Sequence, residues 1–339
     1  MASSELRPDT IPDNLRAAKE AAVAQFLSKE PAGPIMAFAA HSNPKNNVVG
    51  VGIGRKIKDG KTTARHSVRF YVKRKLDVKS IDKRFLLPKK IGNVPTDVIE
   101  TGEFRPFGNP AAERAYKRPA QPGCSVGFQF TGSQAGTVMA GTFGAVVEVN
   151  GIRYILSNNH VLANQNALPI GSAIFQPGLL DKNAPGKDAI AKLAKFVPLK
   201  ASGSNKVDCA LAKVDADKLI SPIVMDKVGA LKSVLPITAA VAMKVEKTGR
   251  TTGYTTGTVT DVAATMKVTY DLGVLTFTDQ ILIIGGAEAF SDAGDSGSLI
   301  VDRKTKRATG LLFAGSASHT IANHMEDVLH ALNATIVIG

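Results

Sequence analysis

The chain from about residue 124 onward consists of many short apolar runs separated by turn residues. The runs 141–149 and 152–156 are joined by Asn150-Gly151, a dipeptide that favours a type I′ hairpin turn. Further strand-like runs are 189–196, 207–213, 241–247, 256–262, 266–270, 274–284, 298–301, 308–314 and 318–322, followed by an expected helix at 324–332. Short strands at such spacing are typical of sandwiches and barrels, so the pattern predicts a mainly β fold.

One polar turn within this pattern carries a serine. Residues 291–297 read Ser-Asp-Ala-Gly-Asp-Ser-Gly and lead into the apolar run that begins at Ser298. A turn of this kind can hold the Ser296 hydroxyl outward and direct backbone N–H groups at one point, which suits a nucleophile beside an oxyanion hole. An ordinary loop could carry the same residues, so the hypothesis needs a base and an acid elsewhere in the chain.

A candidate base follows the first hairpin, in Leu156-Ser157-Asn158-Asn159-His160-Val161. Of the six histidines, only His160 stands on the first turn after a strand-like run. An imidazole in such a place can lean over a cleft and exchange protons near neutral pH. A purely structural histidine is the alternative that stays open.

A candidate acid lies in the apolar segment Val207-Asp208-Cys209-Ala210-Leu211. A carboxylate that is buried without a partner is costly, so Asp208 needs a hydrogen-bond donor. An imidazole N–H would serve, and the carboxylate would then fix the tautomer of the base. Asp215 and Asp217 are competing carboxylates, and an exposed, structural Asp208 is the other alternative.

The order His160, Asp208, Ser296 and the segments around these residues resemble the three motifs of chymotrypsin-like (trypsin-like) serine proteases. Gln176-Pro177-Gly178, Gly-Arg-Thr-Thr-Gly at 249–253 and Val-Pro-Thr-Asp-Val at 94–98 are similar to segments of intracellular bacterial and plant narrow-leaf-type trypsin-like peptidases. The resemblance implies a chymotrypsin-like double β-barrel, and a serine endopeptidase that needs no metal or organic cofactor.

The resemblance also implies the role of each residue. Ser296 would be the nucleophile, His160 the general base and then the general acid, and Asp208 the orienting acid. The backbone N–H groups of Gly294 and Ser296 would form the oxyanion hole. Peptide bonds of a protein or peptide substrate would be hydrolysed through an acyl-enzyme on Ser296.

Four further residues correspond to substrate-binding positions of the family. Phe290 stands six residues before Ser296, where an acid in the family selects basic side chains, so we expect a neutral, fairly apolar pocket. Gly315 and Ser316 would lie near the substrate backbone. Phe313 occupies a position where the family usually has a serine that supports the catalytic Asp, which is a departure from the pattern.

Two more departures concern the surroundings of the triad. Asn158 and Asn159 replace the small residues that most family members carry before the histidine. In many secreted relatives, a cleavage frees an N-terminus that forms a salt bridge with the Asp that here is Asp295. A cut near Gly123 could free such an end, although nothing in the sequence requires it.

The N-terminal third differs from the rest in charge. The net charge is +13, of which residues 1–122 carry +11. We expect a helix at 14–28, strands at 48–54 and 67–72 joined through Asp59-Gly60, a short helix or turn near 77–86, and a strand at 97–102. The predicted organisation is a basic α+β regulatory or docking domain at 1–104, a Pro- and Gly-rich linker at 105–122, and a trypsin-like protease domain at 123–339.

The basic N-terminal domain could attract an acidic partner, nucleic acid or an anionic membrane. Its densest basic clusters, Lys73-Arg74-Lys75 and Lys89-Lys90, are not interleaved with many aromatic residues. Nucleic-acid binding gains from such aromatics, so we favour a regulatory partner that docks on this domain. The sequence contains no run of 18 apolar residues, so no transmembrane segment is predicted. Oligomerisation stays open.

Cysteine usage bears on the compartment. Cys124 and Cys209 allow at most one disulfide, and the first residues lack the basic and apolar regions of a signal peptide. A reducing, cytoplasmic location is therefore expected, with Cys209 packed in a barrel core and a disulfide left open. Two alternatives to the enzyme also remain: a catalytically silent protease fold that binds or scaffolds, and a basic-domain protein that binds nucleic acid or an anionic partner.

Overall fold

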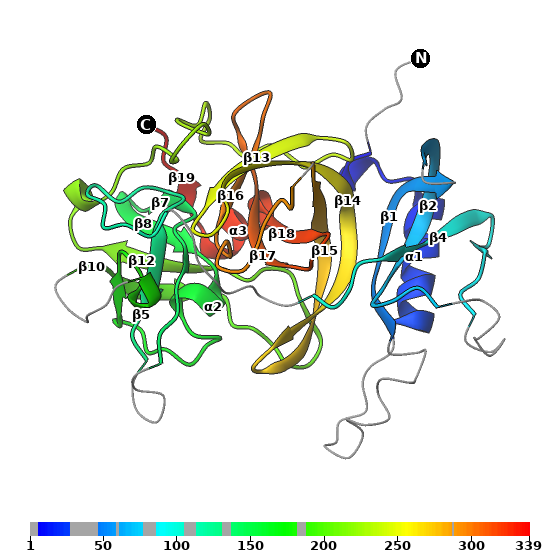
Figure 1. The fold of residues 1–339 in the computed structure, drawn as a ribbon, viewed down its shortest axis with the longest axis horizontal. Coiled ribbons are helices and arrows are strands. Elements are labelled where there is room, and N and C mark those ends of the chain that lie inside the picture. The colour runs from blue at the N-terminus through cyan, green and yellow to red at the C-terminus, as the bar shows by residue number, and fades with distance from the viewer. Residues whose placement is uncertain are drawn as a thin grey trace.

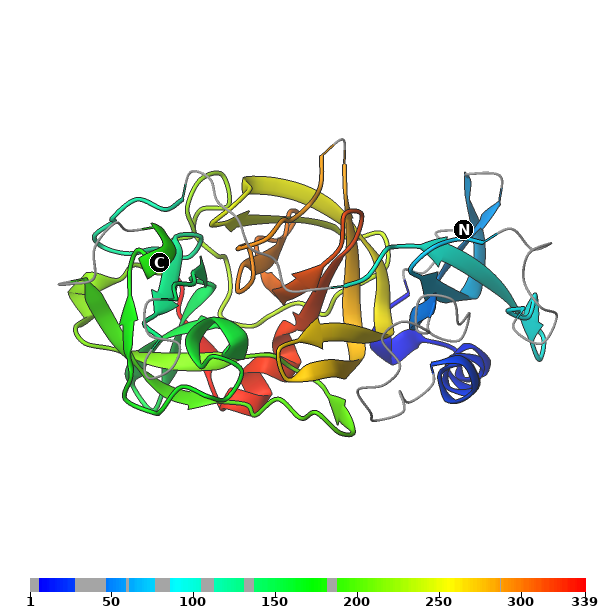
Figure 2. The same cartoon turned by 60° about the horizontal axis from the view of Figure 1, so that its bottom comes forward.

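The computed structural model describes residues 6–27, 47–58, 61–76, 86–104, 113–130, 137–181, 188–286 and 288–339. Figures 1 and 2 show three parts in a row: a barrel that includes β5, β7, β8, β10 and β12, a second barrel that includes β13 to β18, and the N-terminal strands with helix α1. The expected fold class, a mainly β protein with a chymotrypsin-like double β-barrel after a small α+β part, is confirmed.

The first barrel is an eight-stranded sheet in the order β19-β7-β8-β12-β10-β9-β5-β6. At the predicted hairpin, Asn150 and Gly151 have φ of 50° and 76°, the left-handed values that a type I′ turn requires. The strands are β5 (Ser125–Phe128), β6 (Gly141–Thr142), β7 (Ala145–Val149), β8 (Ile152–Ser157), β9 (Ala173–Phe175), β10 (Ala189–Phe196), β12 (Ala210–Val214) and β19 (Thr335–Ile336).

The second barrel is closed, because β14 pairs with β15 at one end of the order β15-β18-β17-β16-β13-β14. The runs 256–262 and 266–270 were expected as two strands, but they form one strand whose register with β15 shifts between Val259 and Met266. Bulges therefore replace the expected break. The strands are β11 (Ser204–Asn205), which pairs with β15, β13 (Lys244–Gly249), β14 (Gly253–Tyr270), β15 (Gly273–Gly285), β16 (Leu299–Asp302), β17 (Ala308–Gly315) and β18 (Thr320–His324).

The helices are short. The two longer ones were both predicted: α1 (Asp13–Phe26) near 14–28, and α3 (Met325–Leu332) near 324–332. Within the described ranges no helix is long and apolar enough to cross a membrane. The others are α2 (Asn159–Leu162) and the 3-10 turns η1 (Pro8–Thr10), η7 (Leu179–Asp181) and η8 (Asp217–Leu219).

The N-terminal strands continue the sheet of the second barrel. Their order is β1 (Val48–Lys58), β2 (Lys61–Val72), β4 (Val94–Glu100) and β3 (Lys90–Ile91), and β1 pairs with β14 at Gly50↔Met266 and Val51↔Thr265. Phe70 belongs to the same buried cluster as Ile281 of the barrel. Three expected features lie outside the described residues, wholly or in part. They are the turn at Asp59-Gly60, the element near 77–86 (of which only residue 86 is described) and 105–112 of the linker. The boundaries at 104 and 123 stay a prediction.

Both cysteines are buried free thiols, so the disulfide that the sequence left open does not form. Cys209 packs in the apolar cluster that also contains Leu156 of the first barrel and Leu311 of the second. Burial raises the pKa of both thiols, that of Cys124 to about 12, which keeps them protonated and poorly reactive.

A buried carboxylate lies where the N-terminal strands meet the second barrel. Asp261 is fully buried, and its carboxylate accepts hydrogen bonds from the Tyr71 hydroxyl at 2.9 Å and from the Ala263 N–H at 2.9 Å. Gly52 faces this group so closely that a Cβ there would overlap the carboxylate. Burial raises the pKa of Asp261 to about 6.

This raised pKa predicts a pH dependence of stability. Between about pH 4 and pH 6 the folded protein holds a proton on Asp261 that the unfolded chain releases, so this contribution to stability is lost as pH rises through about 6. In Asp261→Asn the contribution is absent. We expect the free energy of unfolding of the wild type, relative to Asp261→Asn, to fall by about 2 kcal/mol from pH 4.5 to 7 in urea titrations. Parallel pH profiles of the two proteins would contradict the assignment.

Candidate active site

The two barrels bring the three predicted catalytic residues to one place. His160 lies in α2, directly after β8, and Asp208 lies two residues before β12, which pairs with β8. Ser296 lies in the turn that precedes β16 of the second barrel. Thr142 of the first barrel connects the two sides, because its N–H donates to the Ser296 carbonyl at 2.8 Å.

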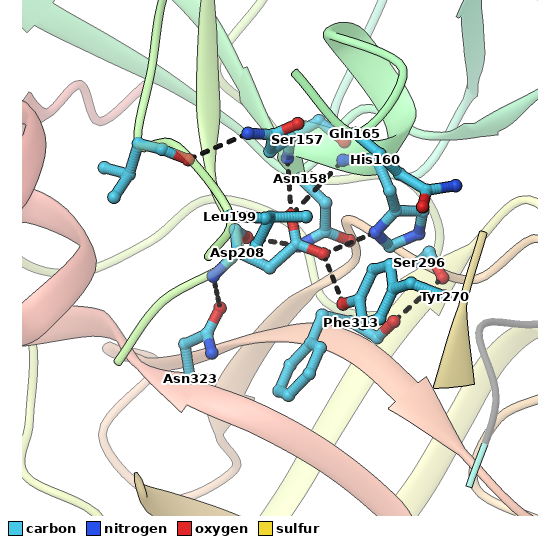
Figure 3. A network of polar contacts seen from close by, with 12 residues as sticks. Ser157, Asn158, His160, Gln165, Leu199, Asp208, Tyr270, Ser296, Phe313 and Asn323 are labelled. Atoms are coloured by element: carbon cyan, nitrogen blue, oxygen red, sulfur yellow. Dashed lines mark hydrogen bonds and ion pairs between the residues drawn. The ribbon is translucent and has the colours of Figure 1, made fainter. Parts of the chain in front are cut away.

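His160 and Asp208 form a short, buried pair, which Figure 3 shows. Nδ1 of His160 lies 2.6 Å from Oδ2 of Asp208, and the backbone N–H groups of Asn159 and His160 donate to Oδ1 at 2.6 and 3.3 Å. With Nδ1 bound to the carboxylate, Nε2 is the ring atom left to exchange a proton. Asp208 was expected inside a strand at 207–213, but the strand begins at Ala210 and Asp208 lies on the loop before it.

A tyrosine from the second barrel completes the surroundings of Asp208. The Tyr270 hydroxyl donates to Oδ2 of Asp208 at 2.6 Å, and its ring meets the His160 ring edge to face at 5.8 Å. The sequence analysis missed Tyr270. Its position at the end of a strand-like run carries no chemical signal, and it reaches Asp208 only through the way the two barrels pack.

Phe313 contacts the site through its backbone and not through its ring. Its fully buried ring packs on Phe277 at 4.6 Å, while its carbonyl accepts a hydrogen bond from the Ser296 hydroxyl at 3.3 Å. Among the residues described, no hydrogen bond joins Ser296 to His160 in this conformation. The hydroxyl that Asp208 receives from the second barrel thus comes from Tyr270 of β14, because the Phe313 side chain in β17 carries none.

The turn of Ser296 packs tightly on the start of α2. At Gly297, with φ of 94°, a Cβ would overlap the Ser157 hydroxyl at the end of β8. At Gly141 a Cβ would lie 2.6 Å from Val161 and 3.0 Å from the Ser296 carbonyl. Glycine at these two places lets the nucleophile candidate approach the histidine segment.

Two backbone N–H groups of this turn have no partner within the described part of the chain. The N–H of Asp295 donates to Asp292 and that of Gly297 donates to Leu312, at 3.0 and 2.8 Å. Those of Gly294 and Ser296 have no acceptor among the described residues. Gly294 has φ of 97°, and a Cβ there would overlap the Arg250 guanidinium. The geometry suits an oxyanion hole.

Asp295, next to Ser296, forms a fully buried salt bridge with Lys247 of β13. Lys247 Nζ lies 3.0 Å from Oδ2, which also accepts from the Thr252 hydroxyl at 2.6 Å, and Oδ1 accepts from the Thr251 N–H at 2.8 Å. Burial lowers the pKa of Lys247, and Asp295 opposes that shift. The cation that pairs with Asp295 therefore comes from inside the barrel.

The Gly-Arg-Thr-Thr-Gly segment at 249–253 contacts both the Ser296 turn and the first barrel. Buried Arg250 forms a bidentate pair with Asp181 of the first barrel, Nε to Oδ2 at 2.6 Å and Nη2 to Oδ1 at 2.5 Å. The two threonines bind Asp295, as described above. The segment thus joins the turn to the opposite barrel.

The other expected site residues lie around this centre. Phe290 is 2% exposed and belongs to the buried cluster that also includes Ile283, so its side chain is part of the core. Gly315 ends β17, and the Ser316 N–H donates to the His319 carbonyl at 2.7 Å. Gly315 and Ser316 therefore continue the backbone of β17, the strand whose Phe313 carbonyl accepts the hydrogen bond from Ser296.

Asn158 and Asn159 have structural partners. The Asn158 side chain donates to the Asp208 carbonyl at 2.8 Å, and the Asn159 side chain donates to the Val197 carbonyl at 2.8 Å. The two amides therefore fix the loop that carries the acid. In the described part of the chain, no group of three or more His, Cys, Asp or Glu residues could hold a metal ion.

Comparison with known proteins gives distant matches. A family model described as the Nal1 C-terminal domain matches residues 212–330. Protein NARROW LEAF 1 of Oryza sativa subsp. japonica is 27% identical in an alignment that covers 80% of this chain and 51% of that protein. The chain therefore spans about half the length of this relative.

Among solved structures, similar chains are serine proteases. A glutamic acid specific serine protease, described as using a histidine triad in substrate binding, has a TM-score of 0.45 at 18% identity, covering 64% of this chain and 100% of its own. Thermobifida fusca Protease A has a TM-score of 0.46 at 17% identity, covering 65% of this chain and 100% of its own. Identities and TM-scores this low give no basis for assigning the substrates of those enzymes to this chain.

The buried Lys247–Asp295 pair predicts a strong and specific stability effect. Lys247→Met leaves a buried carboxylate without its cation, so we expect a loss of about 3–5 kcal/mol in the free energy of unfolding. Adding Asp295→Asn should cost less than the sum of the two single changes. Urea unfolding of the four proteins measures the cycle. Lys244→Met, at the exposed first residue of the same strand, is the matched control and should change stability by less than about 0.5 kcal/mol. Equal effects of both lysine changes would contradict the prediction.

Proposed function

We propose that the protein is a serine endopeptidase that hydrolyses peptide bonds through an acyl-enzyme on Ser296. The observation that carries the proposal is the short His160–Asp208 pair, with the Ser296 turn packed on the end of β8 and on α2 beside it. The N–H groups of Gly294 and Ser296, which have no acceptor among the described residues, would stabilise the oxyanion of a tetrahedral intermediate.

The first step requires a small movement of one hydroxyl. Ser296 Oγ rotates away from the Phe313 carbonyl, to which it donates at 3.3 Å, toward Nε2 of His160. Catalytic hydrogen bonds often tighten only when substrate is bound. As Oγ attacks the peptide carbonyl carbon, Nε2 takes the hydroxyl proton, and Asp208 stabilises the imidazolium through Nδ1.

The remaining steps use the same groups. The carbonyl oxygen becomes an oxyanion and accepts hydrogen bonds from the N–H groups of Gly294 and Ser296. His160 then returns the proton to the leaving amine, which leaves the acyl-enzyme. A water that gives its proton to His160 attacks the ester and regenerates Ser296.

Substrate backbone would bind along the end of β17. Once Ser296 has rotated, the Phe313 carbonyl is free to accept an N–H of the substrate, and Gly315 and Ser316 continue the edge. The Phe290 side chain is part of the core, so it supplies no carboxylate where the sequence analysis expected the pocket, and the proposed preference is for neutral side chains.

Activity would not depend on cleavage near Gly123. The carboxylate of Asp295 already has a buried cation in Lys247 at 3.0 Å. We also propose that a regulatory partner docks on the basic N-terminal part. The proposed substrates are proteins or peptides in the cytoplasm.

An active-site-directed reagent tests the proposal directly. A fluorophosphonate phosphonylates a serine whose proton a nearby base can take: a bond forms from the serine oxygen to phosphorus and fluoride leaves. We therefore expect labelling of the wild type and at least a hundredfold slower labelling of Ser296→Ala and His160→Ala. In-gel fluorescence and mass spectrometry measure the label and its position. A peptide library then identifies the cleaved bonds.

Ser318→Ala, which removes an exposed hydroxyl close to Ser316, is the matched control and should label like the wild type. Thermal unfolding confirms that each variant is folded. Folded wild-type protein that takes no label would contradict the proposal and favour a silent protease fold that binds its partners.

A further inference from the structure

The carboxylate of Asp208 is fully buried, and its hydrogen bonds come from few groups. Oδ1 accepts from two backbone N–H groups, those of Asn159 and His160. Oδ2 accepts from Nδ1 of His160 and from the Tyr270 hydroxyl, both at 2.6 Å. Besides His160, Tyr270 is the one side chain in the described residues that donates to this carboxylate. Removing it leaves Oδ2 with a single donor.

Tyr270 packs against two neighbouring rings, those of Phe277 and His160. It stacks on Phe277 with centroids 5.9 Å apart and an interplanar angle of 28°, and Phe277 in turn packs on Phe313. The ring meets the His160 imidazole at an interplanar angle of 75°. Burial and the Asp208 carboxylate raise the pKa of Tyr270, so the hydroxyl keeps its proton and acts as the donor.

The tip of the β14–β15 hairpin, which carries Tyr270, is fixed to the loop after α2. The Gln165 side chain donates to Asp271 at 2.8 Å and accepts from the Leu272 N–H at 3.3 Å. On the other side, the Thr269 N–H donates to the Phe104 carbonyl at 3.2 Å. The hydroxyl is therefore presented to Asp208 by a strand end that is fixed on both sides.

We propose that Tyr270 is a positioning residue of the catalytic centre: its hydroxyl fixes the Asp208 carboxylate and thereby the orientation of the His160 ring. The inference rests on the proposed function and extends it, because the position from which the family usually supplies this hydroxyl holds Phe313. Tyr270 does not touch the substrate. Its contribution belongs to the proton transfer, so it affects turnover more than substrate binding.

The test is Tyr270→Phe, which keeps the aromatic stack and removes only the hydroxyl. We expect kcat to fall about 10- to 100-fold, the size of loss expected for one hydrogen bond to a charged group. KM should stay within about twofold, because the lost interaction serves the transition state. The substrate is a peptide from the library digest of the wild type.

Tyr71→Phe is the matched control. It removes another buried Tyr–Asp hydrogen bond, from the Tyr71 hydroxyl to Asp261 at 2.9 Å, within the same apolar cluster as Tyr270. The chemical change and the burial are alike, so both variants should lose a similar amount of stability. Only Tyr270→Phe should lose kcat. A comparable loss of kcat in both variants would overturn the proposal and indicate a general loss of stability.

A second readout does not depend on turnover. The Nδ1 proton of a histidine that is hydrogen-bonded to a carboxylate gives a downfield proton NMR resonance, assigned here by its loss in His160→Ala. Tyr270→Phe should shift this resonance, and Tyr71→Phe should leave it unchanged. If the wild type takes no fluorophosphonate label, the endopeptidase proposal fails, and the resonance still tests whether Tyr270 positions the pair. An unshifted resonance, or an unchanged kcat in Tyr270→Phe, would overturn the inference.

Discussion

The burial of the Asp208 carboxylate is the constraint on which the centre of this molecule depends. A buried charge without partners costs several kcal/mol, so the surrounding groups must be arranged to donate to it. The backbone at the start of α2 and the His160 ring provide this from the first barrel, and Tyr270 provides it from the second. The backbone of Asp208 is held as well, since its N–H donates to Asn323 of β18 at 3.0 Å. Separation of the barrels would therefore remove the Tyr270 donor from this buried carboxylate.

Two more buried carboxylates near Ser296 are also compensated, each by a buried cation. Lys247 neutralises Asp295 within the second barrel, and Arg250 crosses to Asp181 of the first barrel. Both cations come from the stretch that ends β13, so one short segment compensates the charge beside the nucleophile candidate and fixes its turn to the other barrel. Excellent geometry and further hydrogen bonds are what such pairs need to offset desolvation. The threonines at 251 and 252 supply these bonds to Asp295.

Local features of the sequence predicted local features of the structure. Asn150-Gly151 indicated its hairpin because the turn type depends on those two residues alone, and the spacing of apolar runs predicted most strands because alternate burial leaves a periodic pattern. His160, Asp208 and Ser296 could be selected from motif and order. Tyr270 and Lys247 could not, because a tyrosine at a strand end and a lysine within a strand are ordinary residues until long-range pairing buries them. The same holds for the pairing of β1 with β14.

That last pairing changes how the N-terminal part relates to the site. The spacing of apolar runs predicted a break before residue 266, and nothing in it indicated that the N-terminal strands pair with this part of the chain. Instead β14 is continuous: Met266 pairs with Gly50, and Tyr270 at the end of the same strand reaches Asp208. One apolar cluster contains Val49, Tyr71 and Phe104 of the N-terminal part together with Tyr270, Phe277 and Phe313. The N-terminal strands therefore contact, through direct β1–β14 pairing and a shared apolar cluster, the same strand whose end carries Tyr270 to Asp208.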